Sequence, residues 1–255
     1  MPDRYPIRRA LRKLLRPIVR RSYQPPKSIE PSDLPGPSLF LLAHPDDEVF
    51  CSGLIRYVRE QGQPAHIACF TRGEGGTRGS YPDDVDLAAV REKEMEQSAE
   101  ILGASSLTFL GYEDPETNDD RLESPQFDPL QLQEQLTNLM AKHDISLLVS
   151  HGSSGEYWHP AHVTLHEEAK RLAENHRDLS FWTMNAWVPD HPLDRVLNQD
   201  DIPTLKLDAS SYEEERIQSL LAHQSQLEVF ETFVEGSVRD YIDQTHLEAY
   251  RQVKP

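Results

Sequence analysis

The stretch LFLLAHPDDEVFCSG, residues 39–53, contains the transition that decides the fold. It begins with an apolar run of the length of a buried strand, and His44 follows directly. Pro45 then forces a turn, and the acidic residues 46–48 occupy the start of a predicted helix, where the helix dipole and free backbone N–H groups favour carboxylates. The stretch therefore predicts a strand that ends in a polar turn and leads into a helix.

Short apolar runs continue to alternate with longer amphipathic stretches after residue 38, which is typical of βαβ units around a parallel sheet. This pattern predicts an α/β, Rossmann-like fold with a largely parallel sheet flanked by helices. Right-handed crossovers would place active residues at the carboxyl ends of the strands. The predicted strands are Ser38–Ala43, Ala65–Thr71, Ser106–Leu110, Ile145–Ser150 and Phe181–Val188. The predicted helices are Glu48–Glu60, Asp84–Leu102, Pro129–Lys142, Ala161–Asn175, Tyr212–Glu228 and the last residues of the chain.

The composition excludes several classes of protein. The net charge of -17 argues against nucleic acid as a partner, because binding to phosphates requires a footprint of basic side chains. Two cysteines, Cys51 and Cys69, cannot staple a chain of 255 residues, so a reducing, cytoplasmic setting is expected. No stretch has the length and apolarity of a membrane span or a secretory signal.

The N-terminal segment differs in charge from the rest of the chain. Residues 1–24 contain eight arginine and lysine residues against Asp3 alone, a local charge of +7, and apolar residues recur among them at near-helical spacing. Such a segment can lie on the inner surface of an anionic membrane, dock on an acidic partner, or remain a solvated tail. We predict a basic segment with a proline-rich linker over residues 1–37 and one domain over residues 38–255. The oligomeric state is not predicted.

Two stretches carry residues suited to a metal. His44 and Asp47, three residues apart across the turn, can present a nitrogen and an oxygen to one small cation, although a well-capped helix would explain the acids equally well. In ISLLVSHGSSGEYWHPAHVTLHEEAKRL, residues 145–172, a second buried strand leads through a glycine-containing loop to His159 and His162. One imidazole from this stretch would complete three protein ligands and leave a fourth position open, as in catalytic zinc sites.

Other assignments compete for these histidines. His162 and His166 lie four residues apart on one helical face and could form a metal pair of their own, and His151 at a strand end could also point into the cleft. Five further histidines occupy polar or loop positions and are predicted to be exposed: His66, His143, His176, His191 and His246.

The loop TRGEGGTRGS, residues 71–80, follows a predicted strand as phosphate-binding loops do. It does not match G-x-G-x-x-G or the G-K-[ST] signature, so a nucleotide cofactor is disfavoured. We expect a loop at the rim of a cleft, where Arg72 or Arg78 contacts polar groups of a substrate. Cys51 is expected to pack on the inner face of its helix.

Several motifs occur together in the order found in one known family. AHPDDE followed by a late HPxH resembles the LmbE-like, or PIG-L, deacetylases, which act on N-acetylglucosaminyl phosphatidylinositol and on precursors of mycothiol and bacillithiol. The resemblance extends over about residues 38–226 and includes ACFTRGEGG, VREKEMEQSAEILG, FLGYEDPE and LLAHQSQ.

The resemblance implies a role for individual residues. It makes His44, Asp47 and His162 the zinc ligands and Asp46 the general base. It also implies that His159, as an imidazolium, and Tyr157 act on the carbonyl and the leaving amine, and that Arg91 and Asp114 hold the substrate.

One position departs from the family pattern. Where the family usually has HPDH, this chain has HPAH, so Ala161 replaces an acid thought to orient the catalytic histidine. Glu156 or another acid could take that role.

The resemblance implies zinc-dependent hydrolysis of the amide of an N-acetylglucosamine-type conjugate by a water activated at the metal. Fe2+ or another divalent transition metal would also suit a His-Asp-His site. The alternative is a metal-binding protein that holds a sugar or lipid headgroup with little turnover because of Ala161.

Overall fold

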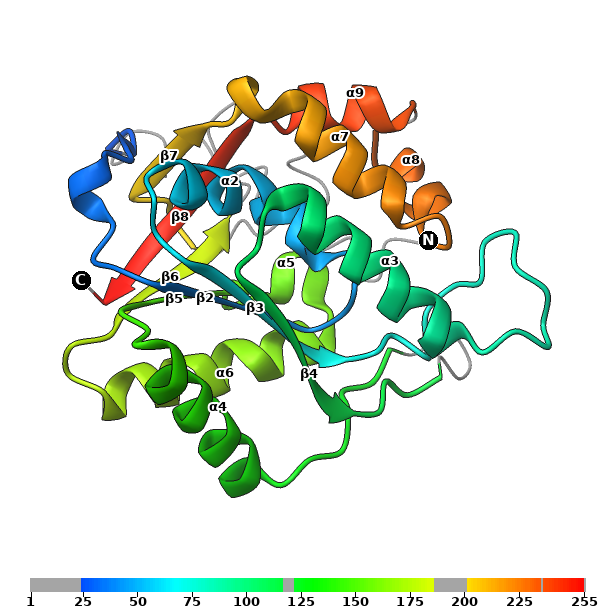
Figure 1. Ribbon diagram of the computed structural model, residues 1–255, viewed down its shortest axis with the longest axis horizontal. Coiled ribbons are helices and arrows are strands. Elements are labelled where there is room, and N and C mark those ends of the chain that lie inside the picture. Colours follow the sequence, from blue (N-terminus) through cyan, green and yellow to red (C-terminus); the bar gives the residue numbers. More distant parts are fainter. Residues whose placement is uncertain (1–23, 117–121, 186–200, 235, 255) are drawn as a thin grey trace, which may run out of the picture.

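The computed structural model describes residues 24–116, 122–185, 201–234 and 236–254, and the basic segment 1–23 lies outside these ranges. Eight strands of the described part form one sheet in the order β1-β7-β8-β6-β5-β2-β3-β4 (Figure 1). The strands are β1 (Lys27–Ser28), β2 (Ser38–Leu42), β3 (Ala65–Thr71), β4 (Ser106–Tyr112), β5 (Leu147–Ser150), β6 (Ser180–Asn185), β7 (Leu205–Asp208) and β8 (Leu247–Lys254).

The sheet is largely parallel. Strands β2 to β6 pair in parallel with their neighbours of this group, and β1 pairs in parallel with β7. Strand β8 runs antiparallel between β6 and β7. The predicted α/β fold with a largely parallel sheet is therefore confirmed.

Helices cover both faces of the sheet (Figure 1). Helices α4 and α6 lie on one face, and α2, α3 and α7 lie on the other. The helices are α2 (Ser52–Glu60), α3 (Leu87–Leu102), α4 (Pro129–His143), α5 (Gly155–Trp158), α6 (Pro160–Asn175), α7 (Glu213–Ala222), α8 (Leu227–Val234) and α9 (Val238–Gln244), with 3-10 turns at η1 (Pro31–Asp33), η2 (Asp47–Cys51) and η3 (Ser210–Tyr212).

Strand β2 shows how the sequence builds the two cores. Its side chains alternate, as in any strand. Phe40 and Leu42 join the cluster under α2 and α3, whereas Leu39 and Leu41 join the cluster against α4 and α6. Because both faces are covered, the strand is apolar throughout and every residue in it is buried. Burial of apolar surface on both sides holds the carboxyl end of β2 rigidly in place.

The helix ends follow local chemistry. The Asp86 side chain accepts a hydrogen bond from the Ala89 N–H and starts α3, which ends at Gly103 in the left-handed region with φ 71°. The Asp128 side chain caps α4 in the same way and is followed by Pro129, a residue favoured in the first helical turn.

The order of the strands creates a switch point between β2 and β5. The chain adds β3 and β4 on one side of β2, and then adds β5 and β6 on the other side. The loops that leave the carboxyl ends of β2 and β5 therefore diverge, which is where parallel α/β sheets bind ligands. His44 follows β2 and His151 follows β5, so the topology brings the two histidine-bearing stretches together.

Two sequence expectations differ from the structure. The last residues form β8 and not a helix, because their backbone groups pair with β6 and β7, which are distant in sequence. The predicted helix Tyr212–Glu228 is split into α7 and α8, and residues 223–226 between them serve the functional site. The predicted strand Phe181–Val188 is present as β6, and its last three residues lie outside the described ranges.

The described end of the predicted linker packs on the domain. Lys27 and Ser28 form β1, and the side chains of Ile29 and Leu34 belong to the core cluster under α2. The boundary between residues 37 and 38 stays a prediction. None of the described helices is long and apolar enough to cross a membrane.

Candidate active site and metal centre

Three of the predicted metal ligands converge at the switch point. His44 directly follows β2, Asp47 opens η2, and His162 lies in the first turn of α6. His44 Nδ1 lies 3.2 Å from His162 Nε2 and 3.4 Å from Asp47 Oδ2, and His162 Nε2 lies 3.2 Å from Asp47 Oδ1. All three side chains are buried. Two stretches more than 100 residues apart thus present two nitrogens and a carboxylate to one small volume.

The 3.2 Å between His44 Nδ1 and His162 Nε2 fits two ligands of a tetrahedral metal, whereas the two Asp47 distances join different carboxylate oxygens. With metal–ligand distances of about 2.0–2.1 Å, ligand atoms of such a site lie about 3.3–3.4 Å apart. His44, His159 and His162 also form a group that could hold a metal ion. The electrostatics agree: burial opposes protonation of His44, but Asp114 and Asp47 overcome it and raise the pKa of His44 to about 10. The pocket therefore stabilises positive charge at the point where a cation would sit.

His151 is close to this cluster, but both of its ring nitrogens contact other groups. Its Nε2 accepts a hydrogen bond from the Ala43 backbone N–H over 3.0 Å, and its Nδ1 lies 2.7 Å from Glu156 Oε2. The nitrogen that accepts from the backbone has no lone pair left for a metal, and the other carries the proton that Glu156 accepts. His151 Nε2 also lies 3.5 Å from Asp47 Oδ2, and Asp47, His151 and His162 form another group that could hold a metal ion, but His151 could join it only by giving up the hydrogen bond from Ala43. His166 is turned away, with its Nδ1 3.0 Å from the His151 carbonyl oxygen.

His159 ends the loop before α6 and faces the same cluster. Its ring centroid lies 4.6 Å from those of both His44 and His162. Its Nδ1 accepts a hydrogen bond from the Ala161 N–H over 3.3 Å, so the ring carries its proton on Nε2. Burial, together with the rings of His44 and His162, holds the pKa of His159 well below its usual range. The ring is therefore neutral and offers an N–H donor, in contrast to the expected imidazolium.

Asp46 lies beside the cluster in a strained conformation. Its φ of 107° falls in the left-handed region, which non-glycine residues rarely adopt. Burial raises the pKa of Asp46 to about 7, against the opposing influence of the Arg91 guanidinium, whose Nη2 lies 3.4 Å from Asp46 Oδ2. A carboxylate with a pKa near neutrality is suited to accept and return a proton.

Arg91 on α3 supports the turn that contains Asp46. Its guanidinium donates to the backbone carbonyls of Pro45 over 2.5 Å and Gly73 over 2.9 Å. Gly73 and Gly76 let the loop lie directly on this guanidinium, since a Cβ at either position would overlap it. Gly73 and Gly76 are thus explained by close approach to Arg91, whereas a Cβ at Gly75 would meet the Pro115 backbone and one at Gly79 the Ser225 backbone. In the structure the buried Arg91 supports the turn that contains Asp46, and its expected contact with substrate stays a prediction.

Arg72 and Arg78 of the same loop are both paired within the protein. Arg72 Nη2 lies 2.7 Å from Glu92 Oε2, and Arg78 donates to the Val85 carbonyl oxygen over 2.7 Å. These contacts help to shape the loop, and a substrate contact for either arginine stays a prediction.

The two remaining predicted residues lie next to metal-site histidines. Asp114 follows β4 and its Oδ1 lies 3.4 Å from His44 Nε2, on the side of the ring away from His162. The ring of Tyr157 lies 5.4 Å from that of His162 and 5.8 Å from that of His159. Asp114 is thus placed to orient a ligand, and Tyr157 borders the cluster.

A buried network behind Asp46 was missed in the sequence. Glu48 Oε2 accepts a hydrogen bond from the Asp46 N–H over 3.1 Å, while its Oε1 contacts Ser98 Oγ and His223 Nε2. Two residues later, Ser225 donates to both oxygens of Glu94 on α3. The LLAHQSQ motif, which had no assigned role, thus joins the catalytic turn to α3.

Glu156 is the second residue whose partners differ from expectation. It was considered as a replacement acid for His159, but its Oε2 contacts His162 Nδ1 at 2.6 Å and His151 Nδ1 at 2.7 Å. Burial raises its pKa, but these two histidines outweigh burial and lower it to about 2, so Glu156 is a carboxylate. Sequence spacing could not predict these contacts, because they depend on the irregular φ values of α5, the segment that contains Glu156.

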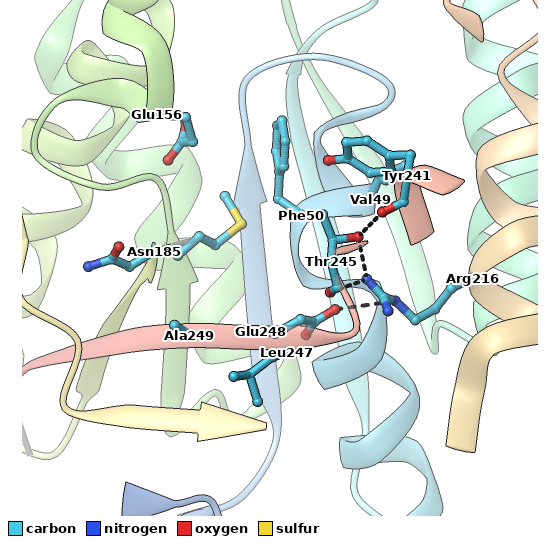
Figure 2. Close-up of a pocket in the computed structure, with 11 residues that line it drawn as sticks. Val49, Phe50, Glu156, Asn185, Arg216, Tyr241, Thr245, Leu247, Glu248 and Ala249 are labelled. Atoms are coloured by element: carbon cyan, nitrogen blue, oxygen red, sulfur yellow. Dashed lines mark hydrogen bonds and ion pairs between the residues drawn. The ribbon is translucent and has the colours of Figure 1, made fainter. Parts of the chain in front are cut away.

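A small cavity lies behind Glu156, between β6, β8 and α7. Figure 2 shows Glu156 and Asn185 on one side and Arg216 with Glu248 on the other, with Phe50 between them. Its volume of about 20 Å³ is enough for one water molecule and not for a sugar. The cavity is therefore too small to be the site of a sugar substrate.

Comparison with known proteins agrees with this site. The family model GlcNAc-PI de-N-acetylase (PIG-L) matches residues 39–173, more than half of the chain. A probable N-acetyl-alpha-D-glucosaminyl L-malate deacetylase 2 of Bacillus anthracis is 29% identical over 214 residues, which cover 80% of this chain and 86% of that protein.

Solved structures share the fold at low sequence identity. The 4-carboxy-2-hydroxymuconate hydratase of Pseudomonas putida KT2440 is 17% identical with a TM-score of 0.64, and the match covers 86% of this chain and 97% of that one. The N,N'-diacetylchitobiose deacetylase of Pyrococcus horikoshii is 19% identical with a TM-score of 0.56, covering 98% and 94% respectively. Together with the family match over the histidine-bearing stretches, these findings show that the chain belongs to the PIG-L, or LmbE-like, deacetylase family.

Proposed function

We propose that this protein is a metal-dependent de-N-acetylase that hydrolyses the amide of an N-acetylglucosamine-type conjugate. The observation that carries the proposal is the approach of His44 Nδ1, His162 Nε2 and the Asp47 carboxylate to within 3.2–3.4 Å of one another, with Asp46 alongside. Because one relative of this fold is a hydratase, the fold alone does not choose the reaction. The family match and the relative that acts on a glucosaminyl malate conjugate favour amide hydrolysis.

His44, Asp47 and His162 would hold the cation, and zinc is the metal that such a ligand set suits best, with Fe2+ as the other candidate. When bound, the metal would act as a Lewis acid on the amide carbonyl and on a water molecule. The protein's own residues would supply the remaining steps.

Asp46 would act as general base and take a proton from the attacking water. The Nε2–H of His159 would donate to the oxyanion that develops on the amide oxygen, with Tyr157 at its side. Asp46, now protonated, would return that proton to the nitrogen as the C–N bond breaks, so that an amine and acetic acid leave, and the acid then loses its own proton to become acetate. A neutral His159 suffices for this scheme, because the proton that the amine needs comes from the water.

The test combines metal analysis with turnover. Purified full-length protein is analysed for metal content, supplied with zinc, and incubated with N-acetylglucosamine conjugates of malate, inositol and phosphatidylinositol. We expect about one metal per chain and equal amounts of released amine and acetate with at least one conjugate. Stoichiometric metal without amine from any conjugate would contradict the proposed activity.

The alternative, a metal-binding protein that holds a headgroup without turnover, is favoured by one observation. His159 Nδ1 is capped by a backbone N–H at the position where the family has an acid. The two candidates differ in a single-turnover experiment, since only the enzyme releases amine from a stoichiometric amount of conjugate. Binding of a conjugate without release would support the alternative.

A further inference from the structure

Glu156 is the carboxylate that contacts the far side of a proposed metal ligand. Its Oε2 lies 2.6 Å from His162 Nδ1, whereas His162 Nε2 faces His44 and Asp47. The same oxygen lies 2.7 Å from His151 Nδ1. Its other oxygen accepts the Gly152 backbone N–H over 3.0 Å. The carboxylate is thus fully engaged, in an environment where the side chain is only 5% exposed.

These contacts determine which nitrogen of each ring carries a proton. His151 Nε2 accepts the Ala43 N–H, so His151 carries its proton on Nδ1 and donates it to Glu156 Oε2. The same carboxylate oxygen is placed to accept a hydrogen bond from His162 Nδ1. For His162 this leaves the lone pair of Nε2 on the side of His44 and Asp47, in the tautomer that can bind a cation. A carboxylate behind a histidine also strengthens that histidine as a metal ligand.

His151 connects this carboxylate to the sheet. Its Nε2 accepts the Ala43 N–H at the end of β2, one residue before His44. A continuous chain of hydrogen bonds thus runs from Ala43 through His151 and Glu156 to His162. It joins the two stretches that supply the metal ligands.

The backbone around Glu156 adopts φ values that residues other than glycine rarely adopt. Glu156 has a φ of 55° and Trp158 a φ of 69°, both in the left-handed region. Such conformations are unfavourable for residues other than glycine and persist where the surroundings impose them, commonly at functional sites. Gly155, with a φ of 53°, lies so close to His162 that a Cβ there would come within 2.9 Å of its Cβ. The loop is therefore bent to bring the Glu156 carboxylate behind the His162 ring.

We propose that Glu156 is a positioning residue that keeps His162 in its metal-binding tautomer and, through His151, ties it to the end of β2. The inference rests on the metal site of the proposed function. It adds to that function a residue that touches neither the metal nor the substrate. Because Ala161 provides no acid on α6, the carboxylate behind His162 and His151 comes from the preceding segment, α5.

The experiment measures metal affinity and needs no substrate. Metal-free wild-type protein and the variant Glu156→Gln are titrated with Zn2+ and Co2+ in competition with a chelating dye. The amide cannot accept all three hydrogen bonds and carries no charge, so we expect affinity to fall about 10- to 100-fold and the Co2+ absorption spectrum to change. The matched control is Glu168→Gln. Glu168 is a buried carboxylate on the same helix as His162, and it contacts Gln133 of α4. This variant should bind metal as the wild type does.

Three outcomes distinguish the proposals. Wild-type protein that binds no metal would contradict the metal centre of the proposed function. Equal affinity and equal spectra for wild type and a folded Glu156→Gln would overturn the role of Glu156 alone. Partial recovery of affinity in Glu156→Asp would support it. If Glu156→Gln does not fold, the nitrogen-15 spectrum of the metal-free wild type decides, since His162 protonated on Nε2 and not on Nδ1 would refute the inference.

Discussion

The backbone N–H of Ala161 donates to Nδ1 of His159 over 3.3 Å, so the histidine that faces the site also caps the start of α6. The Ala161 side chain is fully buried in the apolar cluster between α4, α6 and the sheet. An acid at this position would therefore enter a packed apolar environment as well as approach His159.

We expect Ala161→Asp to lower the free energy of unfolding by about 3 kcal/mol or more and to reduce turnover, because it buries a charge without a partner. Urea unfolding and the deacetylation assay measure the two effects. Ala169→Asp is the matched control, since Ala169 is buried in the same cluster on the same helix. A stable Ala161→Asp with higher turnover would instead show that this chain has lost a catalytic acid.

Replacing Asp46 should separate metal binding from catalysis. Asp46→Asn keeps the size of the side chain but cannot take a proton, so we expect kcat to fall about 10²- to 10⁴-fold while metal content stays unchanged. Asp144→Asn is a suitable control, because Asp144 also has a positive φ, of 52°, and lies at the end of α4 away from the site. A variant with normal turnover would remove Asp46 from the mechanism.

The glycine loop should tolerate no side chain at residue 76. A Cβ there would overlap Arg91 Nη1, so Gly76→Ala should displace the guanidinium from Pro45 and Asp46. We expect a loss of about 1–3 kcal/mol in stability, typical of overpacking, together with a lower kcat.

In the control Gly62→Ala, the new Cβ has no atom within 4 Å, but φ is 76°, so it should cost about 1 kcal/mol of stability and leave kcat unchanged. If Gly76→Ala retained full activity at equal stability, the support of the catalytic turn by Arg91 would be disproved.

Stability should depend on pH through a histidine pair remote from the metal centre. Burial first, and then the neighbouring His143, lower the pKa of His66 from 6.5 to about 4. The unfolded chain thus binds a proton more readily than the folded protein, so the contribution of His66 is fully present above pH 6.5 and is lost as pH falls toward 4.

Urea unfolding at pH 7 and pH 5 checks this dependence. The drop in the free energy of unfolding between the two pH values should be smaller in His66→Gln than in the wild type. His143→Gln should also reduce it, because it removes one cause of the pKa shift. Identical drops in all three proteins would contradict the assignment.

The basic N-terminal segment should bind anionic membranes. Its charge of +7 over residues 1–24 predicts salt-sensitive binding, worth about 1 kcal/mol for each basic residue that reaches the surface. Full-length protein and a variant without residues 1–23 are sedimented with phosphatidylserine vesicles and with neutral vesicles. We expect the truncated form to lose binding to the phosphatidylserine vesicles and to behave like the longer protein with neutral vesicles. Unchanged sedimentation with the phosphatidylserine vesicles would exclude the segment as a membrane contact.

Local patterns were sufficient to predict the elements that lead into the site. The apolar run before His44 and the acids after it define β2 and its turn without reference to other parts of the chain. The pairing of β8 between β6 and β7 depends on strands far away in sequence, so the C-terminal residues could not be distinguished from a helix. Secondary structure was therefore predictable where burial on both faces of a strand leaves a continuous apolar run.

The predicted metal ligands could likewise be found from local sequence, whereas the residues that support them could not. His44 and Asp47 lie in one short motif and His162 lies in another, so a resemblance to a family is enough to identify them. The contacts of Glu48 with His223 and of Glu156 with His162 bring together buried groups through the tertiary fold and through residues with positive φ. No period or propensity encodes such contacts, so only the structure reveals them.

The hydrogen bond from the Ala43 amide to His151 has a consequence for coordination number. Were that imidazole free, four protein groups could surround a cation and enclose it, as in sites that only store or stabilise. The main-chain amide would withhold the fourth donor, and the position left open on a cation held by His44, Asp47 and His162 would be free for a reactant.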